Sequence, residues 1–584
     1  MSADDVARLD ALSKGFRARY LRHDDLTAQM RAWCEAFPAL CRLQSLGNTP
    51  EGRPLWVLTI GPDPDLVRPS VWVDGNMHAG EYAGSSVALA IAEDLLRLHL
   101  DPSATPHGLG PAVTDTLRGV RAFVMPRMSP DGAEAVLTTG RYVRSTPRDT
   151  RGTAPMPRWR HHDLDGDGIA LVMRQEDPSG EYVECDEYAG LLVPRRLEDP
   201  GPYYKIYPEG TVEGWDGRTV PTPHYLQEFD VDLNRNFPFS WAPDDRQLGA
   251  GRYATSEPES RAVVDFFCGH PEIFAWLNLH TFGGVFIRPM GDKPDTKMPP
   301  DDLAVWRQVG QWAEQCTGYP TVSGYEEFLY EPETPLHGDL IDFGYSQRGA
   351  LAYVCELWDL FQQLGIARKK PFVDHYSRFR REDYVTLARW DHAHNASRIV
   401  RPWHPFVHPQ LGPVEIGGLD PRVGIWNPPY DRLGSVCAAQ SAAFLRVAAM
   451  APRVRLSDVA VTPLGGGLHR LQIEVENVGY LPSYVLTSAR SLSWNEPLRV
   501  EVVPGDGVSL NDLSQGRRAL GHLEGWGRGP EGGGSLFHLR SRGSVSRAQA
   551  EALVKGDGYV TVRVVGPRIG TVAVLLRVGG GAAS

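Results

Sequence analysis

Short apolar segments and helix-like segments alternate along the first part of this 584-residue chain, starting near residue 26. The stretches "PLWVLTIG" and "SVWVDGN" have the continuous hydrophobicity of buried strands, and "IFAWLNLH" and "GALAYVCELW" repeat it further along. Between such strands, "LTAQMRAWCEAFPAL" and "GSSVALAIAEDLLRLHL" have the periodicity of amphipathic helices. The alternation predicts an α/β domain with a mixed, mostly parallel sheet flanked by helices.

Two regions depart from this alternation. Residues 161–230 hold 16 Asp and Glu against 5 Lys and Arg, with many Gly, Pro and Tyr, which is typical of a long functional insertion. Beyond about residue 405 the hydrophobic pattern becomes two-fold, as in "LQIEVEN" and "YVTVRVVG". We expect an α/β domain over 1–404 with an acidic insertion at about 150–230, a Pro/Gly-rich linker and helix over 405–450, and a smaller all-β sandwich over 451–584.

Charge and composition exclude several classes of partner. The formal net charge is −12 and no basic stripe is present, so we expect no nucleic acid partner. No run approaches the ~18 apolar residues of a membrane helix, and the first residues do not resemble a signal peptide. Seven scattered cysteines without a CxxC pair indicate reduced thiols. We therefore expect a cytoplasmic protein that does not bind membranes.

Polar side chains close several of the predicted strands. The strand "VWVDGN" leads directly into His78 and Glu81, "AWLNLH" ends in His280, and Glu356 lies within the apolar strand "ALAYVCELW". An H-x-x-E pair alone is weak evidence, because a solvated loop histidine and a helix N-terminal glutamate give the same pattern. A carboxylate inside an apolar strand, however, needs a partner to offset the free energy of its burial. The repetition at successive strand ends favours one shared site.

These residue types suit a metal hydrolase. Two histidines and a glutamate form the ligand set of one group of catalytic zinc sites, which leaves a fourth position for water. Glu356 would then act as the general base that takes a proton from that water. In "DVDLNRNFP", the adjacent Asn234 and Arg235 are suited to holding a carboxylate through an amide and a guanidinium fork.

With these pieces in order, the chain resembles the zinc metallocarboxypeptidase family, the pancreatic carboxypeptidase-like peptidases. The matching segments are "NMHAGEYAG", "SPDG", "DLNRNFP", "GRYATSEPES", "LNLH" and "CELWD", which spread over about residues 26–400. The resemblance implies one zinc ion on His78, Glu81 and His280, with Glu356 as the base. It also implies that Asn234 and Arg235 bind the terminal carboxylate of a peptide or protein substrate.

Three further assignments follow from the resemblance. Arg144, twelve residues after Gly132 of the "SPDG" turn, matches the arginine that stabilises the oxyanion, with Arg141 as an alternative. Ile341, in "GDLIDF", matches the floor of the side-chain pocket and implies apolar or aromatic C-terminal residues. The family's mobile tyrosine falls on Thr334, so Tyr330 or Tyr325 would have to replace it.

One other metal motif is present. Asp163, Asp165 and Asp167 in "DLDGDG" have the spacing of an EF-hand-like calcium loop, but its twelfth position is Arg174 instead of glutamate. An Asx-rich turn explains the same residues, so calcium is one of two readings of this loop.

The sequence thus predicts a zinc-dependent peptide hydrolase, a metallocarboxypeptidase that prefers large apolar C-terminal residues. Two alternatives remain. One is a zinc amidase acting on a non-standard amide, such as a cell-wall peptide or a side-chain-linked glutamate. The other is a non-catalytic zinc-containing module that binds carboxylates, although Glu356 argues against it because binding alone needs no base. The C-terminal sandwich has no catalytic constellation and is expected to be a support or interaction module.

Overall fold

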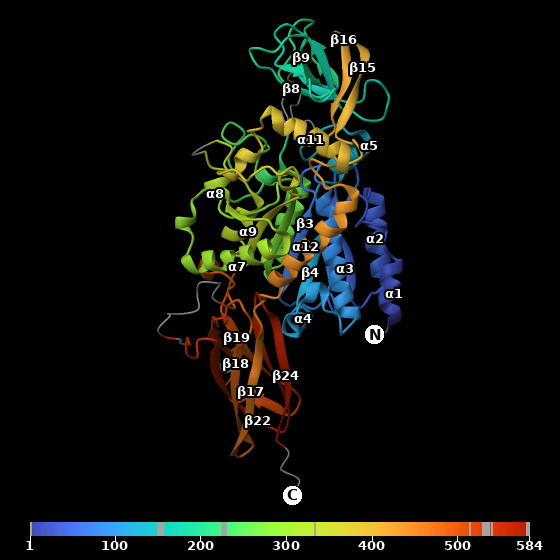
Figure 1. The fold of residues 1–584 in the computed structure, drawn as a ribbon. Coiled ribbons are helices and arrows are strands. Elements are labelled where there is room, and N and C mark those ends of the chain that lie inside the picture. Colours follow the sequence, from blue (N-terminus) through green and yellow to red (C-terminus); the bar gives the residue numbers. More distant parts are fainter. Residues whose placement is uncertain are drawn as a thin grey trace.

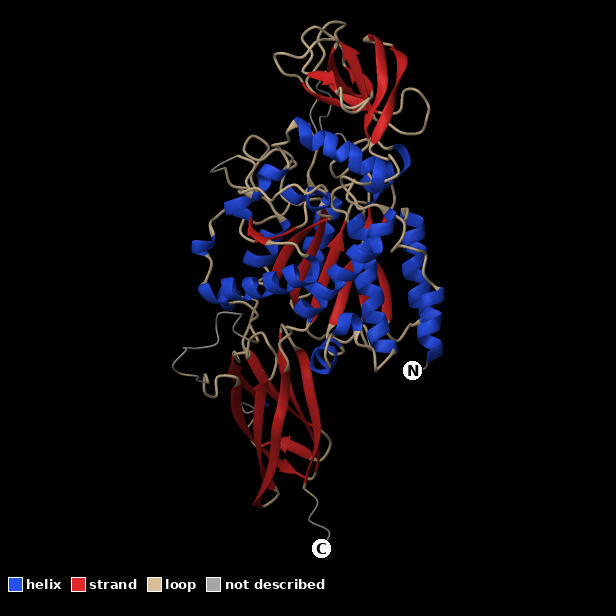
Figure 2. Ribbon diagram, in the orientation of Figure 1, coloured by secondary structure: helices blue, strands red, loops and turns tan. Residues whose placement is uncertain are grey.

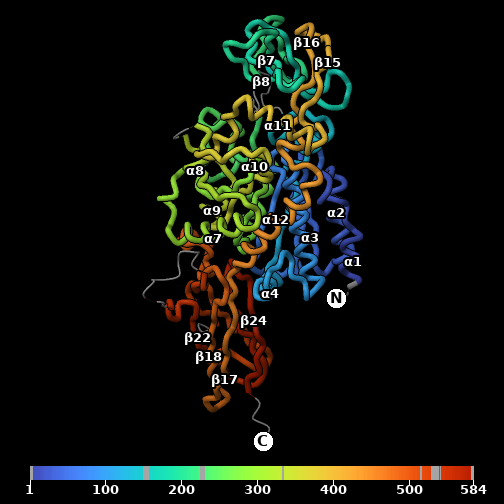
Figure 3. Tube along the Cα trace, in the orientation of Figure 1, coloured from blue at the N-terminus to red at the C-terminus, as the bar shows by residue number. Residues whose placement is uncertain are grey.

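The structure is a computed structural model that describes residues 3–148, 157–223, 230–331, 334–512, 516–527, 538 and 541–579. A central α/β layer lies between two β regions (Figure 1). A small β region formed by residues 158–213 and 400–419 lies at one end, and a larger one formed by the C-terminal residues lies at the other (Figure 1 and Figure 2). Figure 3 traces the chain through these regions.

The central sheet has eight strands in the order β1-β2-β4-β3-β11-β14-β12-β13. Four of its seven neighbouring pairs are parallel and three are antiparallel, which confirms the mixed, mostly parallel sheet. Its strands are β1 (Cys41–Asn48), β2 (Pro54–Ile60), β3 (Ser70–Gly75), β4 (Arg121–Met125), β11 (Ile273–Thr281), β12 (Val285–Arg288), β13 (Thr321–Ser323) and β14 (Leu351–Leu357).

Helices cover both faces of this sheet, since consecutive side chains of its central strands are apolar and point to opposite faces. Val71 and Val73 of β3 face one hydrophobic cluster, whereas Trp72 between them faces another. The α-helices are α1 (Ala3–Ala11), α2 (His23–Ala36), α3 (Ala83–Leu100), α4 (Pro111–Leu117), α5 (Pro130–Thr139), α6 (Pro258–Gly269), α7 (Pro300–Thr317), α8 (Gly324–Glu327), α9 (Leu340–Ser346), α10 (Leu360–Gln363), α11 (Arg381–His394) and α12 (Tyr430–Ala448). Short 3-10 helices are η1 (Pro106–Gly108), η2 (Leu233–Arg235), η3 (Asp295–Lys297), η4 (Phe372–His375) and η5 (Thr487–Ser491).

The acidic insertion folds into strands of its own. A six-stranded sheet has the order β15-β16-β6-β9-β7-β8, and β10 pairs with β5 in a separate two-stranded sheet. Trp159, Met173 and Val212 of the insertion pack with Val414 and Ile416 in a small apolar core. The strands are β5 (Arg158–His161), β6 (Val172–Glu176), β7 (Tyr182–Glu184), β8 (Leu192–Pro194), β9 (Tyr203–Pro208), β10 (Gly210–Glu213), β15 (Val400–His408) and β16 (Gly412–Leu419).

The expectation of a Pro/Gly-rich linker from residue 405 is wrong for its first part. Residues 400–419 form the β15–β16 hairpin, and β16 pairs antiparallel with β6 of the insertion. The glycines obscured these strands in the sequence. Gly417 and Gly418 have φ of 152° and 87°, and a Cβ on Gly418 would lie 2.8 Å from Trp403. Glycine is therefore required for close packing within this hairpin. The expected helix follows as α12.

The C-terminal residues form two four-stranded antiparallel sheets that enclose a common apolar core, which confirms the predicted sandwich. Their orders are β17-β18-β22-β20 and β21-β19-β23-β24. The strands are β17 (Val454–Gly465), β18 (Leu468–Asn477), β19 (Leu498–Pro504), β20 (Val508–Leu510), β21 (Arg517–Gly521), β22 (Arg547–Gly556), β23 (Gly558–Gly566) and β24 (Gly570–Val578).

The sandwich is anchored in the α/β layer by a buried arginine. Arg568, in the β23–β24 turn, is 1% exposed and donates to the main-chain oxygens of Ile273, Arg348 and Gly349. These acceptors lie at the starts of β11 and β14, at the end of the sheet opposite to His280 and Glu356. Residues between 480 and 489 also belong to the main apolar cluster of the α/β layer. Among the described residues, no helix is long and apolar enough to cross a membrane.

Candidate metal centre

The loop after β3 is shaped by glycines that allow the backbones to approach closely. A Cβ on Gly75 would lie 2.6 Å from the carbonyl carbon of Gly84, and one on Gly84 would lie 2.9 Å from the main-chain oxygen of Leu279. Any side chain at these positions would push α3 and β11 away from the end of β3. Asn427 fixes the loop from the other side, donating to Gly80 O at 2.7 Å. These contacts bring His78 and Glu81 close to His280.

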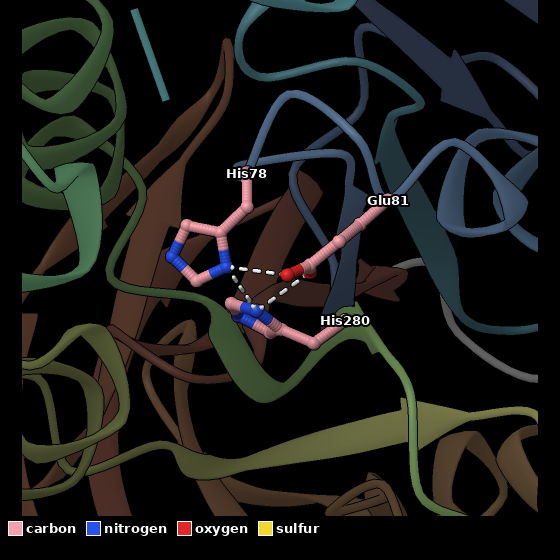
Figure 4. Close-up of side chains that lie close together, drawn as sticks. All are labelled: His78, Glu81 and His280. Atoms are coloured by element: carbon pink, nitrogen blue, oxygen red, sulfur yellow. Dashed lines mark hydrogen bonds and ion pairs between the residues drawn. The ribbon is translucent and has the colours of Figure 1, made fainter. Parts of the chain in front are cut away.

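Three buried side chains converge at this point (Figure 4). His78 Nδ1 lies 2.8 Å from Glu81 Oε1, and His280 Nδ1 lies 3.1 Å from Glu81 Oε2. The two Nδ1 atoms are 3.1 Å apart. Each residue offers one ligand atom within 4.8 Å of the others. The structure thus brings together the three residues predicted as metal ligands.

Hydrogen bonds on the far side of each ring fix the tautomers. His78 Nε2 lies 3.0 Å from Asp232 Oδ1, a carboxylate that can only accept, so His78 carries its proton on Nε2. His280 Nε2 lies 2.5 Å from Asn278 Oδ1 and donates to it in the same way. In the neutral rings both Nδ1 atoms therefore present lone pairs toward Glu81.

The orientation of Asn278 is set in turn by a buried aspartate. Asn278 Nδ2 donates to Asp74 Oδ1 at 2.5 Å, so its oxygen must face His280. Asp74 Oδ2 accepts from the indole N–H groups of Trp72 and Trp276 at 2.8 and 3.0 Å. Asp74 is fully buried, and burial raises its pKa to about 6 even though these hydrogen bonds oppose the shift. In the hydrogen bonds that link Asp74, Asn278 and His280, the donor and the acceptor of each bond are therefore fixed.

This donor set fits a zinc ion. Two imidazole lone pairs and a carboxylate converge in a buried space, where they would repel one another without a cation between them. Burial raises the pKa of Glu81, but positive charge on His78 and a hydrogen bond from His280, whose place a bound cation would take, outweigh it and hold that pKa below the ordinary value. The carboxylate is therefore ionised, as a metal ligand must be.

Glu356 and Arg144 share one pocket with these residues. The pocket has a volume of about 220 Å³ and is also lined by Tyr330, Tyr376 and Trp426. Arg144 Nε donates to Asp232 Oδ2 at 3.0 Å, and its Nη1 lies 3.6 Å from Glu81 Oε1. Arg141, the alternative to Arg144 in the sequence, lines a neighbouring cavity instead. Burial and the charge of Glu81 raise the pKa of Glu356, and Arg144 opposes them.

Asn234 and Arg235 lie on η2, next to Asp232. Asp339, at the N-terminus of α9, holds both side chains. Its Oδ2 accepts from Asn234 Nδ2 at 3.2 Å and lies 3.9 Å from Arg235 Nη1. In the described part of the chain, the Arg235 guanidinium makes one hydrogen bond, from Nη1 to Asn234 O at 2.6 Å. Ile341 is 3% exposed and packs in the apolar cluster on this face of the sheet.

The structure separates the three candidates for the mobile tyrosine. Tyr330 lines the metal pocket and is 60% exposed, so its ring lies at the mouth of the pocket. Tyr325, in α8, is outside the lining. Thr334 is exposed on the surface, where its N–H donates to Glu331 O. Tyr330 is the one of the three that can reach a ligand in the pocket.

The loop with Asp163, Asp165 and Asp167 is an Asx-type turn. Asp163 accepts the main-chain N–H groups of Gly166 and Gly168 at 2.7 and 2.8 Å, and Asp165 accepts that of Asp167 at 3.0 Å. Glu209, not Asp167, completes a group of three carboxylates with Asp163 and Asp165. Backbone donors thus satisfy both oxygens of Asp163 and one oxygen of Asp165, whose other oxygen pairs with His404 Nε2 at 2.5 Å. Calcium at this loop gains no support from these contacts and stays a prediction.

Sequence reasoning missed Asp232, Asn278 and Asp74, which orient the predicted metal ligands His78 and His280. Asp74 carried the same signal as Glu356, because it is a carboxylate within an otherwise apolar strand. Asp232 lies two residues before Asn234, within the polar segment already singled out. No sequence pattern singled out Asn278, because its orientation depends on Asp74 in the neighbouring strand β3.

Fold and geometry together define a class of protein. It has a mixed α/β sheet with a buried cluster of two histidines and a glutamate that could hold a metal ion at the carboxyl ends of β3 and β11, and with a carboxylate and an arginine in the same pocket. Comparison with known proteins gives the family. A family model described as zinc carboxypeptidase matches residues 26–184 and 207–368, which is more than half of the chain. The chain belongs to the zinc carboxypeptidase family, whose members use zinc to hydrolyse peptides.

Individual relatives agree with this membership. Carboxypeptidase A4 of Mus musculus is 29% identical over 332 residues, covering 55% of this chain and 59% of that protein. Carboxypeptidase A2 of Rattus norvegicus is 25% identical over 282 residues, covering 48% of each. Carboxypeptidase D of Anas platyrhynchos is 29% identical over 163 residues, covering 27% of this chain and 10% of that protein. The chain thus spans less than two thirds of the length of these relatives.

Solved structures also match. Carboxypeptidase A from Helicoverpa armigera has a TM-score of 0.39 at 19% identity, covering 61% of this chain and 70% of that chain. Thrombin activatable fibrinolysis inhibitor has a TM-score of 0.41 at 16% identity, covering 76% of this chain and 81% of that chain. A separate model, described as a domain of unknown function, matches residues 453–577 in the sandwich.

Proposed function

We propose that this protein is a zinc-dependent metallocarboxypeptidase that removes C-terminal residues from peptides or proteins, with one zinc ion per chain on His78, Glu81 and His280. The observation that carries the proposal is the convergence of three lone-pair donors in a pocket that also contains Glu356 and Arg144. A module that only binds carboxylates would have no use for a carboxylate base at this place.

The side chains have distinct roles in this proposal. Zinc, when bound, supplies Lewis acidity that polarises the scissile carbonyl and lowers the pKa of water. Glu356 takes the proton of the attacking water and later delivers a proton to the leaving amine. Arg144 offsets the negative charge that develops on the carbonyl oxygen. Asp232 holds Arg144 and His78 together, so one carboxylate positions both the oxyanion partner and a metal ligand.

Asn234 and Arg235 are proposed to bind the free carboxylate of the substrate, with Tyr330 closing over it from the mouth of the pocket. Asp339 supports this role because it positions both side chains. Ile341, buried in the apolar cluster below, supports a preference for large apolar C-terminal residues, since a charged side chain would be buried there without a partner.

The test is cleavage of a peptide library with randomised C-terminal residues, followed by mass spectrometry with and without a chelator. The expected result is loss of single C-terminal residues, fastest for large apolar ones, and no loss in chelator until zinc is restored. Cleavage at internal bonds only, or activity that persists in chelator, would contradict the proposal.

A second candidate is hydrolysis of a non-standard amide, such as a cell-wall peptide or a side-chain-linked glutamate. One observation favours it, namely the contact of Asn234 and Arg235 with Asp339, whose negative charge competes with a substrate carboxylate. This candidate requires that amidated and free peptides be cleaved equally well.

We also propose a cytoplasmic location. All seven cysteines are free thiols, and Cys268 is exposed, which favours a reducing compartment.

A further inference from the structure

A second cavity lies beside the metal pocket, between the segment 141–148 and strands β5, β6 and β9 of the insertion. Its volume of about 720 Å³ falls within the range of ~300–1,000 Å³ usual for ligand sites. The lining carries three Asp or Glu side chains against six cations, which are Arg141, Arg144, Arg148, Arg158, Arg160 and Lys205. An excess of positive charge is notable here because the insertion as a whole is acidic. The cavity therefore favours an anionic occupant.

The two cavities are joined by a shared wall. Tyr142, Val143 and Arg144 line both of them. His161 of β5 holds this wall to the insertion, since its Nδ1 accepts the main-chain N–H of Tyr142 at 2.6 Å and its Nε2 donates to Leu171 O at 2.9 Å. Burial lowers the pKa of His161 to about 4, so this link persists at neutral pH. A substrate polypeptide bound at the metal pocket can therefore continue past Arg144 into the larger cavity.

Some of the cations are already neutralised. Arg148 pairs with Glu257 and Glu259, both at 2.7 Å, and is satisfied within the protein. Arg144 pairs with Asp232 at 3.0 Å, and the longer pairs Arg158–Asp230 and Arg160–Glu213 measure 3.7 and 4.0 Å. Within the described ranges, the positive charge without a close partner therefore rests on Arg141 and Lys205. Arg141 differs, because among the described residues its Nε is buried and has no hydrogen-bond partner. Glu51 acts on Arg141 at longer range only, and is itself hydrogen-bonded to Arg53. A buried donor without an acceptor is the feature that a ligand oxygen would satisfy.

Lys205 supplies a second available charge. It lies on β9, half-buried in the cavity wall, and makes no ion pair within the described part of the chain. Tyr207 lines the same wall, and its ring stacks on that of the buried Trp159 with centroids 5.3 Å apart, which fixes its position. The cavity thus combines two cations with a rigidly held aromatic side chain.

We propose that this cavity binds an acidic segment of the substrate polypeptide on the N-terminal side of the scissile bond, with Arg141 and Lys205 pairing with its carboxylates. This deepens the proposed function and rests on it. The enzyme would select peptides by the charge of the residues that precede the cleavage site, independently of the side chain that is removed.

Two peptides of equal length test this, both ending in phenylalanine with a free carboxylate. One has four consecutive glutamates before its last two residues, and the other has glutamines there. The wild-type zinc enzyme should show a kcat/KM about tenfold higher for the glutamate peptide, mostly through KM, because charge-assisted hydrogen bonds are made in the ground state as well. The preference should shrink as salt is raised.

Variants assign the effect to the cavity. Arg141→Gln and Lys205→Gln should each reduce the preference by about threefold or more, and Arg141→Lys should retain most of it. Arg218→Gln removes the same charge from an exposed position of the insertion outside the cavity lining, and should leave the preference unchanged. Equal kcat/KM for the two peptides, or a preference that survives both Arg141→Gln and Lys205→Gln, would overturn the proposal.

A binding measurement separates this proposal from the proposed activity. The Glu356→Gln variant is titrated with each peptide by calorimetry, so no turnover is needed. Tighter binding of the glutamate peptide that is lost on adding Arg141→Gln supports the cavity even if neither peptide is ever cleaved. Equal affinity for both peptides overturns it, whether or not the wild-type enzyme is active.

Discussion

His280 and Glu356 occupy paired positions on the adjacent parallel strands β11 and β14. Neighbouring strands lie ~4.8 Å apart, and paired residues of parallel strands project from the same face of the sheet. The sheet therefore delivers one proposed metal ligand and the proposed base together, whereas His78 and Glu81 come from the loop after β3. A shift of β14 by one residue would turn Glu356 to the opposite face. The register in which β11 and β14 pair thus determines whether Glu356 lies on the same face of the sheet as His280.

The first prediction concerns the metal. His78→Ala should lose bound zinc and activity together, because one of three protein ligands and the hydrogen bond to Asp232 are removed. Elemental analysis of the purified protein measures the zinc content. His394→Ala, at an exposed position of α11, serves as the control and should retain one zinc per chain. Full zinc content in the His78 variant would place the metal elsewhere.

Glu356→Gln should keep zinc but lose turnover by about 10²–10⁴-fold, because an amide cannot accept the proton of water. The two side chains have nearly the same size, so the pocket keeps its shape. Zinc content and kcat are measured on the same preparation. A variant that loses zinc as well as activity would show that Glu356 also supports the metal, and near-normal turnover would assign the base to another residue.

Asp74→Asn should weaken zinc binding by ~10–100-fold although Asp74 is not itself a proposed ligand. The new amide can donate to Asn278, which lets Asn278 rotate and present its NH₂ group to His280. His280 would then lose the acceptor that fixes its tautomer. Competition with a chromophoric chelator gives the affinity. Unchanged affinity in a folded variant would mean that β11 alone orients His280.

Specificity for a free C-terminus is expected to depend on Arg235. Amidation of the substrate's C-terminus should lower kcat/KM by roughly 10–100-fold, in line with the ~1.5–3 kcal/mol of a charge-assisted hydrogen bond. Arg235→Ala should cleave both forms slowly and at equal rates. If wild-type enzyme cleaves amidated peptides as fast as free ones, or prefers peptides ending in Lys or Glu, the non-standard amide candidate gains and the apolar preference fails.

The sandwich is expected to be necessary for stability. Arg568→Met would leave the main-chain oxygens of Ile273, Arg348 and Gly349 without their buried donor. Because each unsatisfied buried group costs ~1–3 kcal/mol, the free energy of unfolding should fall by roughly 2–5 kcal/mol. Urea denaturation measures this change. Arg577→Met, at an exposed position of β24, is the matched control and should be nearly neutral.

Removal of the whole sandwich tests the same point more severely. The sandwich has no catalytic constellation in its sequence, and its Arg568 contacts the start of β11, whereas His280 lies at the other end of that strand. A chain that ends near residue 450 lacks the 480–489 segment of the main apolar cluster, so we expect it to aggregate or unfold. A soluble, zinc-loaded truncated protein would show that the sandwich is dispensable.

The sequence by itself determined the features that repeat locally. Strand and helix periodicity predicted the mixed sheet and the sandwich, and polar residues at strand ends identified His78, Glu81, His280 and Glu356 as one group. These signals are local because a buried strand or an amphipathic helix is recognisable within about ten residues. The resemblance to a family added Arg144, which the structure places in the same pocket as Glu356.

Only the tertiary structure decided which distant residues complete the site and the fold. Asp232 meets His78 across 154 positions, the β15–β16 hairpin completes a sheet with the insertion more than 200 residues earlier, and Arg568 anchors the sandwich to β11 across 295 positions. Such contacts leave no periodic trace in the sequence, because a buried hydrogen-bond partner is specified by geometry and not by its neighbours along the chain. The hydrophobic periodicity of the sequence thus determines the helices and strands, and the packing of these elements determines which side chains meet at the candidate site.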